Sequence, residues 1–223
     1  MNKKICVVGA GYWGKNHIKT LVKLESLGGV VDLDSNVLKK ISNQHKYIKL
    51  HSSLEDALLT NYDGYIIATP AITHFELAKQ IITAKKDVLI EKPMTLSIKD
   101  SEDLVILSKK MKVNILVGHV LLFHPAIKKI KKLISRGDIG SLQYIYSNRL
   151  NLGKVRTEEN VFWSLAPHDI AIFQYLTDST PKAISANGST ILQKGIPDST
   201  LTQLEYEDGV KGHIFVSWLH PFK

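Results

Sequence analysis

Three groups of residues in this sequence combine types and spacings that could support chemistry. The first is the glycine-rich run at residues 9–14, which follows an apolar segment. The second is the charged pair Glu91-Lys92, which Pro93 follows, at the end of the apolar residues 88–90. The third is the pair at residues 168–169, His-Asp. A glycine turn can hold phosphate groups, and lysine and histidine can donate or accept a proton.

The glycine-rich run has the G-x-G-x-x-G spacing that binds a dinucleotide when a strand precedes it and a helix follows it. Gly9 permits the tight turn, Gly11 lets the backbone approach a pyrophosphate, and Gly14 lets helix and strand pack closely. The phosphates would then meet the free N–H groups at the helix start, beside Tyr12 and Trp13. A glycine turn without a ligand is the competing interpretation.

A carboxylate after the next expected strand bears on which dinucleotide binds. Asp32 follows apolar residues and lies 18 positions after Gly14, close to the spacing expected for an acceptor of the adenosine ribose hydroxyls. An acid there repels the 2′-phosphate of NADP, and no Arg follows it, so the sequence favours NAD over NADP. Asp34 is the alternative ribose ligand, and Asp32 could instead only cap a turn.

The loop that follows the expected strand at residues 65–68 should line the cofactor, because ligands bind at the carboxyl ends of parallel strands. Thr69 and Pro70 open this loop. Residues 73–76, Thr-His-Phe-Glu, have the spacing of a capping box. His74 is either a cofactor contact or a structural residue of the first helical turn.

Together with the glycine-rich run, the charged residues suggest a hydride-transferring enzyme, and oxidation of an alcohol is one such reaction. Such a reaction needs a base within about 2.6–3.2 Å of the hydroxyl while the hydride leaves carbon. We assign His168 as the proton acceptor and Lys92 as the donor that polarises the oxygen, and the reverse assignment stays open. Glu91 would orient Lys92 or the nicotinamide ribose, and Glu91, Lys92 and Pro93 are all candidate cofactor contacts. Asp169 would support the fold around His168, and we place both at a helix start, directly after Pro167.

Composition narrows the function classes. The 223 residues are 44% hydrophobic and 22% charged, which is typical of a soluble globular protein. The net charge of +8 comes mainly from scattered lysines without a recognition motif, so we expect no nucleic-acid partner.

One cysteine, Cys6, excludes an intrachain disulfide. With no apolar run long enough for a signal peptide or a membrane span, we expect a cytoplasmic protein without membrane association. No Cys/His cluster with metal spacing is present, so we expect no metal.

The elements that must position these residues fall into two expected domains of an α/β protein. Strands alternating with helices predict a doubly wound, parallel Rossmann sheet in domain 1–118. Beyond it, segments with period-two character predict an α+β domain, 119–223, with an open, largely antiparallel sheet. Residues 207–209, Glu-Asp-Gly, are the expected hairpin turn of that sheet.

The order of these motifs along the whole chain resembles the glucose-fructose oxidoreductase/inositol dehydrogenase/MocA family. The resemblance implies a Rossmann domain, an open-sheet domain, NAD(P), and hydride transfer at a sugar or polyol carbon. Lys92 matches the family's active-site lysine, His168 its catalytic histidine, and Pro93 a proline often found in a cis peptide. Ser164 stands where inositol dehydrogenases carry Asp, which argues against their proton relay, and Leu122 stands where members often carry Arg.

The segments 118–125, 148–153 and 217–222 are similar to a narrower branch, the nucleotide-sugar 3-dehydrogenases of polysaccharide biosynthesis. This similarity implies a substrate such as a UDP-N-acetyl-hexosamine or its uronate, oxidised at C3. The candidate substrate contacts are His119, Arg149, Asn151 and Asp169. Family members are usually longer, so we expect a chain truncated within its second sheet, and a homo-oligomer if that domain is complete. An NADPH-dependent ketosugar reductase, a non-catalytic NAD sensor and an inactive truncated homologue are the alternatives.

Overall fold

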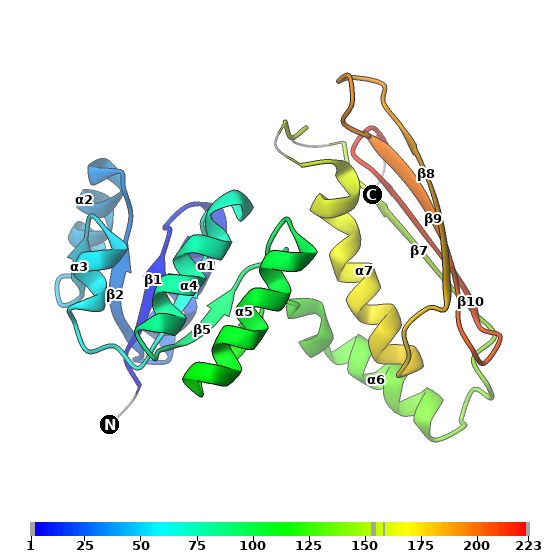
Figure 1. Cartoon of the computed structure of the whole chain (residues 1–223), viewed down its shortest axis with the longest axis horizontal. Helices are drawn as coiled ribbons and strands as arrows, with labels where there is room; N and C mark the ends of the chain where they lie inside the picture. The colour runs from blue at the N-terminus through cyan, green and yellow to red at the C-terminus, as the bar shows by residue number, and fades with distance from the viewer. Residues whose placement is uncertain (1–2, 153–154, 158, 222–223) are drawn as a thin grey trace. The chain divides into compact units, whose positions relative to one another are not determined.

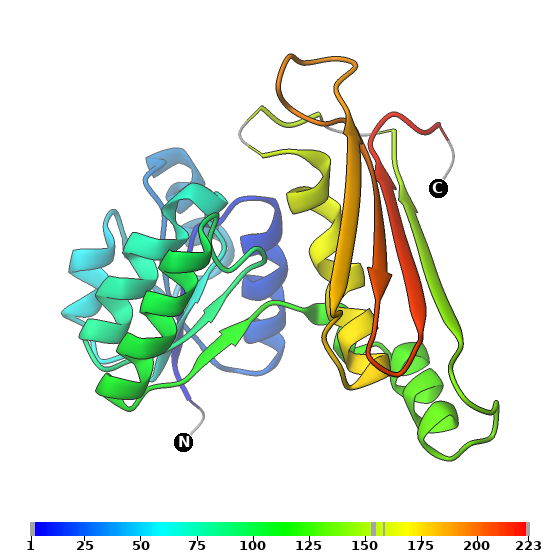
Figure 2. The ribbon, with the colours of Figure 1, turned by 45° about the vertical axis from the view of Figure 1, so that its right-hand side comes forward.

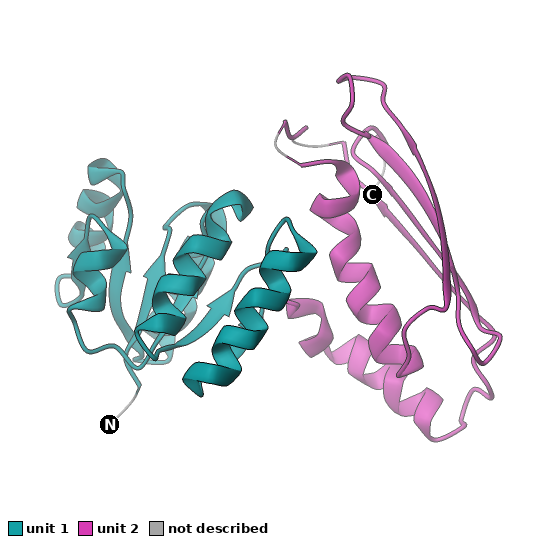
Figure 3. Ribbon diagram, viewed as in Figure 1, with its two compact units in different colours: residues 1–118 teal, residues 119–223 magenta. Residues whose placement is uncertain are grey.

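The computed structural model describes residues 3–152, 155–157 and 159–221 (Figure 1). Gly153 and Phe222, which end two of the segments that resemble the nucleotide-sugar branch, lie outside these residues. The chain divides into two compact units, residues 1–118 and residues 119–223 (Figure 3). Each unit has its own sheet and its own apolar core.

The first unit is built on a six-stranded sheet with the order β3-β2-β1-β4-β5-β6, and all its strand pairs are parallel. Its strands are β1 (Ile5–Val8), β2 (Leu27–Val31), β3 (Lys49–His51), β4 (Gly64–Ile67), β5 (Asp87–Ile90) and β6 (Ile115–Val117). The chain leaves β1 toward β2 and later returns to its other side as β4. Sheets of this kind bind ligands at the carboxyl ends of the strands where the order reverses, which here are β1 and β4.

Helices cover both faces of this sheet, which explains why its central strands β1 and β4 contain no charged residue. The helices are α1 (Tyr12–Lys23), α2 (Ser35–Gln44), α3 (Leu54–Leu58), η1 (Ala71–Thr73), α4 (His74–Thr83) and α5 (Ile98–Met111). Cys6 and Val8 of β1 pack in the cluster of α3, α4 and α5, whereas Val7 packs in the cluster of α1 and α2. Burial raises the pKa of the Cys6 thiol to about 12, so this cysteine is a packing residue and not a nucleophile.

The second unit combines a four-stranded sheet with two α-helices and one short 3₁₀ helix among its described residues (Figures 1 and 2). Its elements are η2 (Val120–Phe123), α6 (Pro125–Ser135), β7 (Tyr144–Leu150), α7 (Val161–Thr177), β8 (Ala183–Ser189), β9 (Ser199–Glu205) and β10 (Lys211–Ser217). The order is β7-β10-β9-β8; β10 pairs antiparallel with β9, β9 pairs antiparallel with β8, and β7 runs parallel to β10. The α/β class with a parallel Rossmann sheet and a largely antiparallel second sheet is therefore confirmed.

Two local predictions are wrong. Helix α7 does not start after Pro167 but at Val161, so His168 and Asp169 lie in its middle. Asn160 caps the helix at this earlier start, because its side chain accepts from the Trp163 N–H. Val161 is completely buried, and the stabilisation from its burial offsets the loss of the backbone hydrogen bond that a proline inside a helix removes.

The second wrong prediction is the capping box at residues 73–76. The Thr73 side chain does not cap α4. Its hydroxyl donates to the Pro70 carbonyl instead, because the intervening 3₁₀ turn brings that oxygen within 2.8 Å. Among the described residues, no helix is long and apolar enough to cross a membrane.

Candidate active site

The glycine-rich turn has the geometry that its spacing predicts. Gly9 has a φ of +90°, and a Cβ there would lie 2.7 Å from Thr69 Cγ2. A Cβ on Gly14 would lie 1.9 Å from the Gly9 carbonyl oxygen, so only glycine allows this approach of α1 to the turn. A Cβ on Gly11 would meet nothing within 4 Å. Gly11 therefore borders open space, which is what a pyrophosphate against the backbone would require.

The N-terminus of α1 carries no side-chain cap, because Gly11 occupies the N-cap position. The first turn contains no acidic residue. Tyr12 and Trp13 begin the helix with exposed rings that meet edge to face, 6.2 Å apart. The free N–H groups and the helix dipole make this terminus suitable for the diphosphate of a dinucleotide.

Asp32 lies at the carboxyl end of β2 and contacts the glycine turn directly. Its Oδ2 accepts from the Ala10 N–H at 2.8 Å, and its Oδ1 accepts from the Asp34 N–H at 2.9 Å. Asp34 is exposed and caps α2 by accepting from the Asn36 N–H at 2.8 Å. Of the two aspartates, Asp32 is the one that contacts the glycine turn, which favours it over Asp34 as the ribose ligand. Asp32 also caps a turn, as the alternative interpretation expected, because it accepts from the Asp34 N–H.

The loop after β4 is held close to the glycine turn. Thr69 packs against Gly9, and its hydroxyl lies 2.7 Å from that of Thr73. His74 is buried, with Nε2 3.0 Å from the Thr69 carbonyl and Nδ1 2.9 Å from the Pro93 carbonyl. Both ring nitrogens therefore contact backbone, which favours the structural interpretation of His74 over direct contact with a cofactor. Pro70 precedes the 3₁₀ turn and is exposed.

Glu91, Lys92 and Pro93 leave the carboxyl end of β5, and the Lys92–Pro93 peptide is cis. Glu91 is nearly buried, and its Oε1 lies 2.6 Å from Nε2 of His17 on α1. Lys92 follows β5 and the glycine turn follows β1, so both lie at the carboxyl ends of the parallel strands.

Sequence reasoning missed His17. Its position in the sequence could have revealed it. The buried residues of α1 are Gly14, Ile18 and Leu21, and His17 lies on the same face of the helix. A polar residue on such a face requires a buried partner.

In the second unit, Asp169 ties α7 to β7. Arg149 donates to it twice, Nε to Oδ2 at 2.7 Å and Nη2 to Oδ1 at 2.9 Å, and the Ser147 hydroxyl donates to Oδ1 at 2.6 Å. Asp169 is buried, so this geometry favours the interpretation that it supports the fold around His168 over direct contact with a substrate.

The remaining candidates also lie in the second unit. His168 is half-buried on α7, next to Asp169. His119 immediately precedes η2, and the Asn151 backbone N–H donates to the Ser217 carbonyl just after β7. Lys92 and His168 belong to different units, so their convergence on one substrate stays a prediction. Within the described ranges, no three His, Cys, Asp or Glu side chains are grouped as a metal site.

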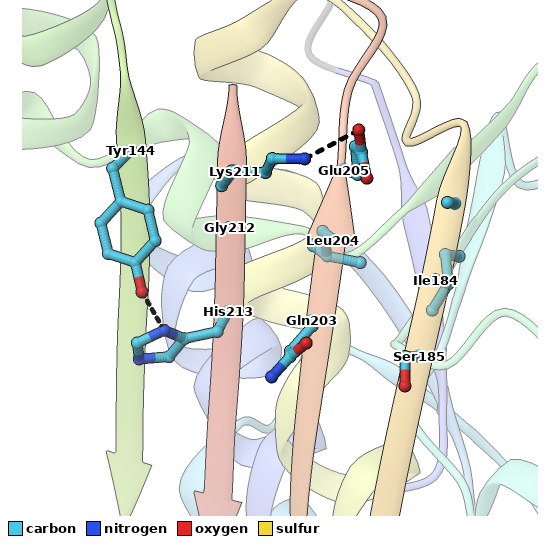
Figure 4. Close-up of a pocket in the computed structure, with 10 residues that line it drawn as sticks. Tyr144, Ile184, Ser185, Gln203, Leu204, Glu205, Lys211, Gly212 and His213 are labelled. Atoms are coloured by element: carbon cyan, nitrogen blue, oxygen red, sulfur yellow. Dashed lines mark hydrogen bonds and ion pairs between the residues drawn. The ribbon is translucent and has the colours of Figure 1, made fainter. Parts of the chain in front are cut away.

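A hollow on the second unit's sheet contains none of the candidate residues (Figure 4). It spans the face on which Gln203, Glu205 and His213 alternate with the buried residues of β9 and β10. Figure 4 shows the Tyr144 hydroxyl hydrogen-bonded to the His213 ring and the ion pair between Lys211 and Glu205. The Lys211 Nζ and Glu205 Oε1 atoms are 2.7 Å apart. These contacts join neighbouring strands across the open face.

Comparison with known proteins identifies the family. Residues 3–119 match the family model described as "Oxidoreductase family, NAD-binding Rossmann fold", and residues 127–223 match the "GFO/IDH/MocA C-terminal domain". The chain belongs to the GFO/IDH/MocA family. The first unit of this family member is therefore an NAD-binding Rossmann domain, as the glycine turn and Asp32 predict.

Two curated relatives of this GFO/IDH/MocA chain are informative. An "Uncharacterized oxidoreductase YrbE" of Bacillus subtilis (strain 168) is 25% identical over 94% of the chain and 66% of the relative. A "UDP-N-acetylglucosamine 3-dehydrogenase" of Acidithiobacillus ferrooxidans is 28% identical over 82% of the chain and 56% of the relative. The chain thus spans less than two thirds of the length of these relatives.

Solved structures share the fold. GenD2 from gentamicin A biosynthesis, in complex with NAD, matches with a TM-score of 0.92 at 22% identity, over 100% of this chain and 67% of that one. The WlbA dehydrogenase from Bordetella pertussis, in complex with NADH and UDP-GlcNAcA, matches with a TM-score of 0.89 at 22% identity, over 98% and 73%. At this identity the likeness supports the architecture alone.

Proposed function

We propose that this chain forms part of an NAD-dependent dehydrogenase that transfers a hydride between a sugar secondary alcohol and nicotinamide. The proposed substrate is a UDP-N-acetyl-hexosamine or its uronate, oxidised at C3. The observation that carries the proposal is the glycine turn, open at Gly11 and joined to Asp32, at the sheet edge from which Lys92 emerges. A nucleotide-sugar 3-dehydrogenase at 28% identity supports this substrate class.

The residues of the first unit fit NAD. The uncapped start of α1 would bind the diphosphate, and Asp32 would accept from the adenosine ribose with lone pairs that its two backbone contacts leave available. Tyr12 and Trp13 flank the diphosphate position, and Thr69 lies across the turn from it. Bound there, NAD supplies the carbon that accepts the hydride.

The chain's own residues would handle the proton. His168 would accept the hydroxyl proton, and Lys92 would donate a hydrogen bond to the same oxygen and stabilise the charge that develops on it. The opposite assignment uses the same two side chains. Glu91 would orient Lys92 or the nicotinamide ribose. His119, Arg149 and Asn151 would contact the sugar or its diphosphate, which the chain's net charge of +8 also favours.

Fluorescence titration of NADH, with and without UDP-N-acetylglucosamine and its uronate, tests the proposal. We expect saturable NADH binding that tightens or quenches further when the correct nucleotide sugar is present. Reduction of NAD by that sugar should follow in a turnover assay. Binding of NADH with no response to any nucleotide sugar would contradict the proposed substrate class, and no binding of NADH would contradict the cofactor.

A further inference from the structure

His17 has no role in the proposed function, yet it contacts the residue next to Lys92. Its Nε2 lies 2.6 Å from Glu91 Oε1, and the two side chains are only 17% and 10% exposed. A short contact to a carboxylate that is largely shielded from water is a strong hydrogen bond. It joins α1, the helix that follows the glycine turn, to the first residue after β5.

The other carboxylate oxygen of Glu91 is confined as well. A Cβ on Gly118 would lie 3.0 Å from Glu91 Oε2, and the Gly118 N–H donates to the Ile90 carbonyl at 2.8 Å. Glycine directly after β6 therefore leaves just enough room for this carboxylate. The Glu91 carboxylate is therefore enclosed between α1 on one side and the end of β6 on the other.

Lys92 is also held from its other neighbour. The Pro93 carbonyl contacts Nδ1 of His74, which is 1% exposed and reaches back to the Thr69 carbonyl. Both neighbours of Lys92 are thus contacted by a histidine: His17 of α1 meets the side chain of Glu91, and His74 of α4 meets the backbone carbonyl of Pro93.

We propose that His17 is a positioning residue that links the dinucleotide-binding helix α1 to Lys92 through Glu91. A nearly buried carboxylate that loses its partner must move toward water or be stabilised anew. Because one peptide bond joins Glu91 to Lys92, such a movement would displace the Lys92 side chain. This inference rests on the proposed function, in which Lys92 acts on the substrate hydroxyl.

Turnover of three variants tests the link, with rates given per folded molecule. His17→Leu should lower kcat by about 10²-fold, the cost of misplacing a catalytic group by an ångström. His17→Gln should retain most of the rate, because its amide nitrogen can donate where Nε2 does. His45→Leu, the matched control at the end of α2, should behave as the wild type. A merely structural His17 would lower the melting temperature and leave kcat unchanged, which would overturn the proposal.

Binding of ADP, which carries the diphosphate without nicotinamide, shows whether the variant acts at Lys92 or at the glycine turn. Its affinity should be nearly unchanged in His17→Leu, because the link acts at Lys92 and not at the glycine turn. An affinity for ADP that falls in parallel with kcat would place the effect at the phosphate site and overturn the proposal.

A third measurement does not need turnover, so it separates failure of this inference from failure of the proposed function. Lysines of the apoprotein are acetylated with trace acetic anhydride, and the peptides are quantified by mass spectrometry. His17→Leu should change Lys92 labelling several-fold and leave exposed Lys99 unchanged. Should His17→Leu not fold, Glu91→Leu removes both carboxylate oxygens, breaks the same link from the other side and should change Lys92 labelling alike. Lys92 labelling equal to the wild type in the folded variant would overturn the proposal, whether or not the wild type turns over.

Discussion

At the scale of single residues, two neighbouring carboxylates of the first unit have different roles because of what they contact. Asp32 accepts from the glycine turn, whereas Asp34 accepts from the start of α2. The sequence offered both as ribose ligands, since both follow β2. The choice depends on strand register, which places Asp32 beside Ala10.

We predict that Asp32→Ala weakens NAD binding and reduces the preference for NAD over NADP by about 1–3 kcal/mol, the cost of leaving a polar partner unpaired. Part of the loss in NAD affinity will come from the freed Ala10 N–H. Titrations with NADH and NADPH measure both effects. Asp34→Ala is the control, because it removes only a helix cap and should leave the preference intact. An equal change in the two variants would show that Asp32 does not read the ribose.

Two glycines of the turn should respond in opposite ways. Gly11→Val should abolish NADH binding and leave the melting temperature nearly unchanged, because its side chain enters the open space meant for the pyrophosphate. Gly14→Ala should instead unfold or strongly destabilise the unit, since its Cβ would lie 1.9 Å from the Gly9 carbonyl oxygen. Thermal melts and NADH titrations distinguish the two. Normal NADH binding by Gly11→Val would mean that the turn is only structural.

At the scale of elements, buried carboxylates attach irregular or edge segments of the second unit to its core. Asp169 connects α7 with the edge strand β7, and Asp198 holds the segment between β8 and β9. Neither contact could be predicted from the sequence. Asp169 meets a residue 20 positions away, and Asp198 meets backbone N–H groups, which leave no mark on the sequence. The pattern rules also failed locally at Pro167, where burial of the preceding turn outweighed the usual place of proline at a helix start.

Arg149→Met should destabilise the second unit by about 3 kcal/mol, the lower end for breaking a buried ion pair, because Arg149 keeps some exposure. The variant removes both Arg149 hydrogen bonds to the Asp169 carboxylate and leaves the one from the Ser147 hydroxyl in place. Urea denaturation measures the loss. Arg136→Met, which removes a partly exposed pair with Asp138, serves as the control and should change stability by less than about 1 kcal/mol. Equal effects would mean that the Arg149–Asp169 contact contributes little.

Asp198 should make stability depend on pH in the acid range. Burial raises the pKa of Asp198, but the N–H groups of Leu192 and Ile191 and the Trp218 indole outweigh it and hold the pKa below the ordinary 3.8. The unfolded chain therefore takes up this proton at a higher pH than the native protein does. The stabilisation is complete above about pH 4 and is lost as the pH falls through the native value.

Asp198→Asn should accordingly lower stability at neutral pH and flatten its decline below about pH 4. The amide cannot accept from all three donors, and its own N–H₂ would meet one of them. Urea denaturation at a series of pH values measures both effects. An acid slope equal to that of the wild type would assign the pH dependence to other carboxylates.

At the scale of the whole molecule, the two-part architecture follows from the change of periodicity near Gly118. Alternating strands and helices, with glycines at fixed spacing, predict the parallel sheet and its ligand edge because each rule depends only on neighbouring residues. The contact of His17 with Glu91 and that of Arg149 with Asp169 escaped prediction, because the two partners lie 74 positions apart in the first contact and 20 in the second. The joint action of Lys92 and His168, one from each unit, remains the central prediction.

The rate of NAD reduction by the cognate nucleotide sugar in the wild type, Lys92→Met, His168→Ala and the double variant tests that prediction most directly. Each single variant should lose about 10²–10⁴ in turnover, the usual share of general acid–base catalysis, with NADH affinity nearly unchanged. The double variant should lose less than the product of the two single losses, as residues serving one hydroxyl do. Single variants that turn over as the wild type does, or losses that multiply in the double variant, would contradict the account.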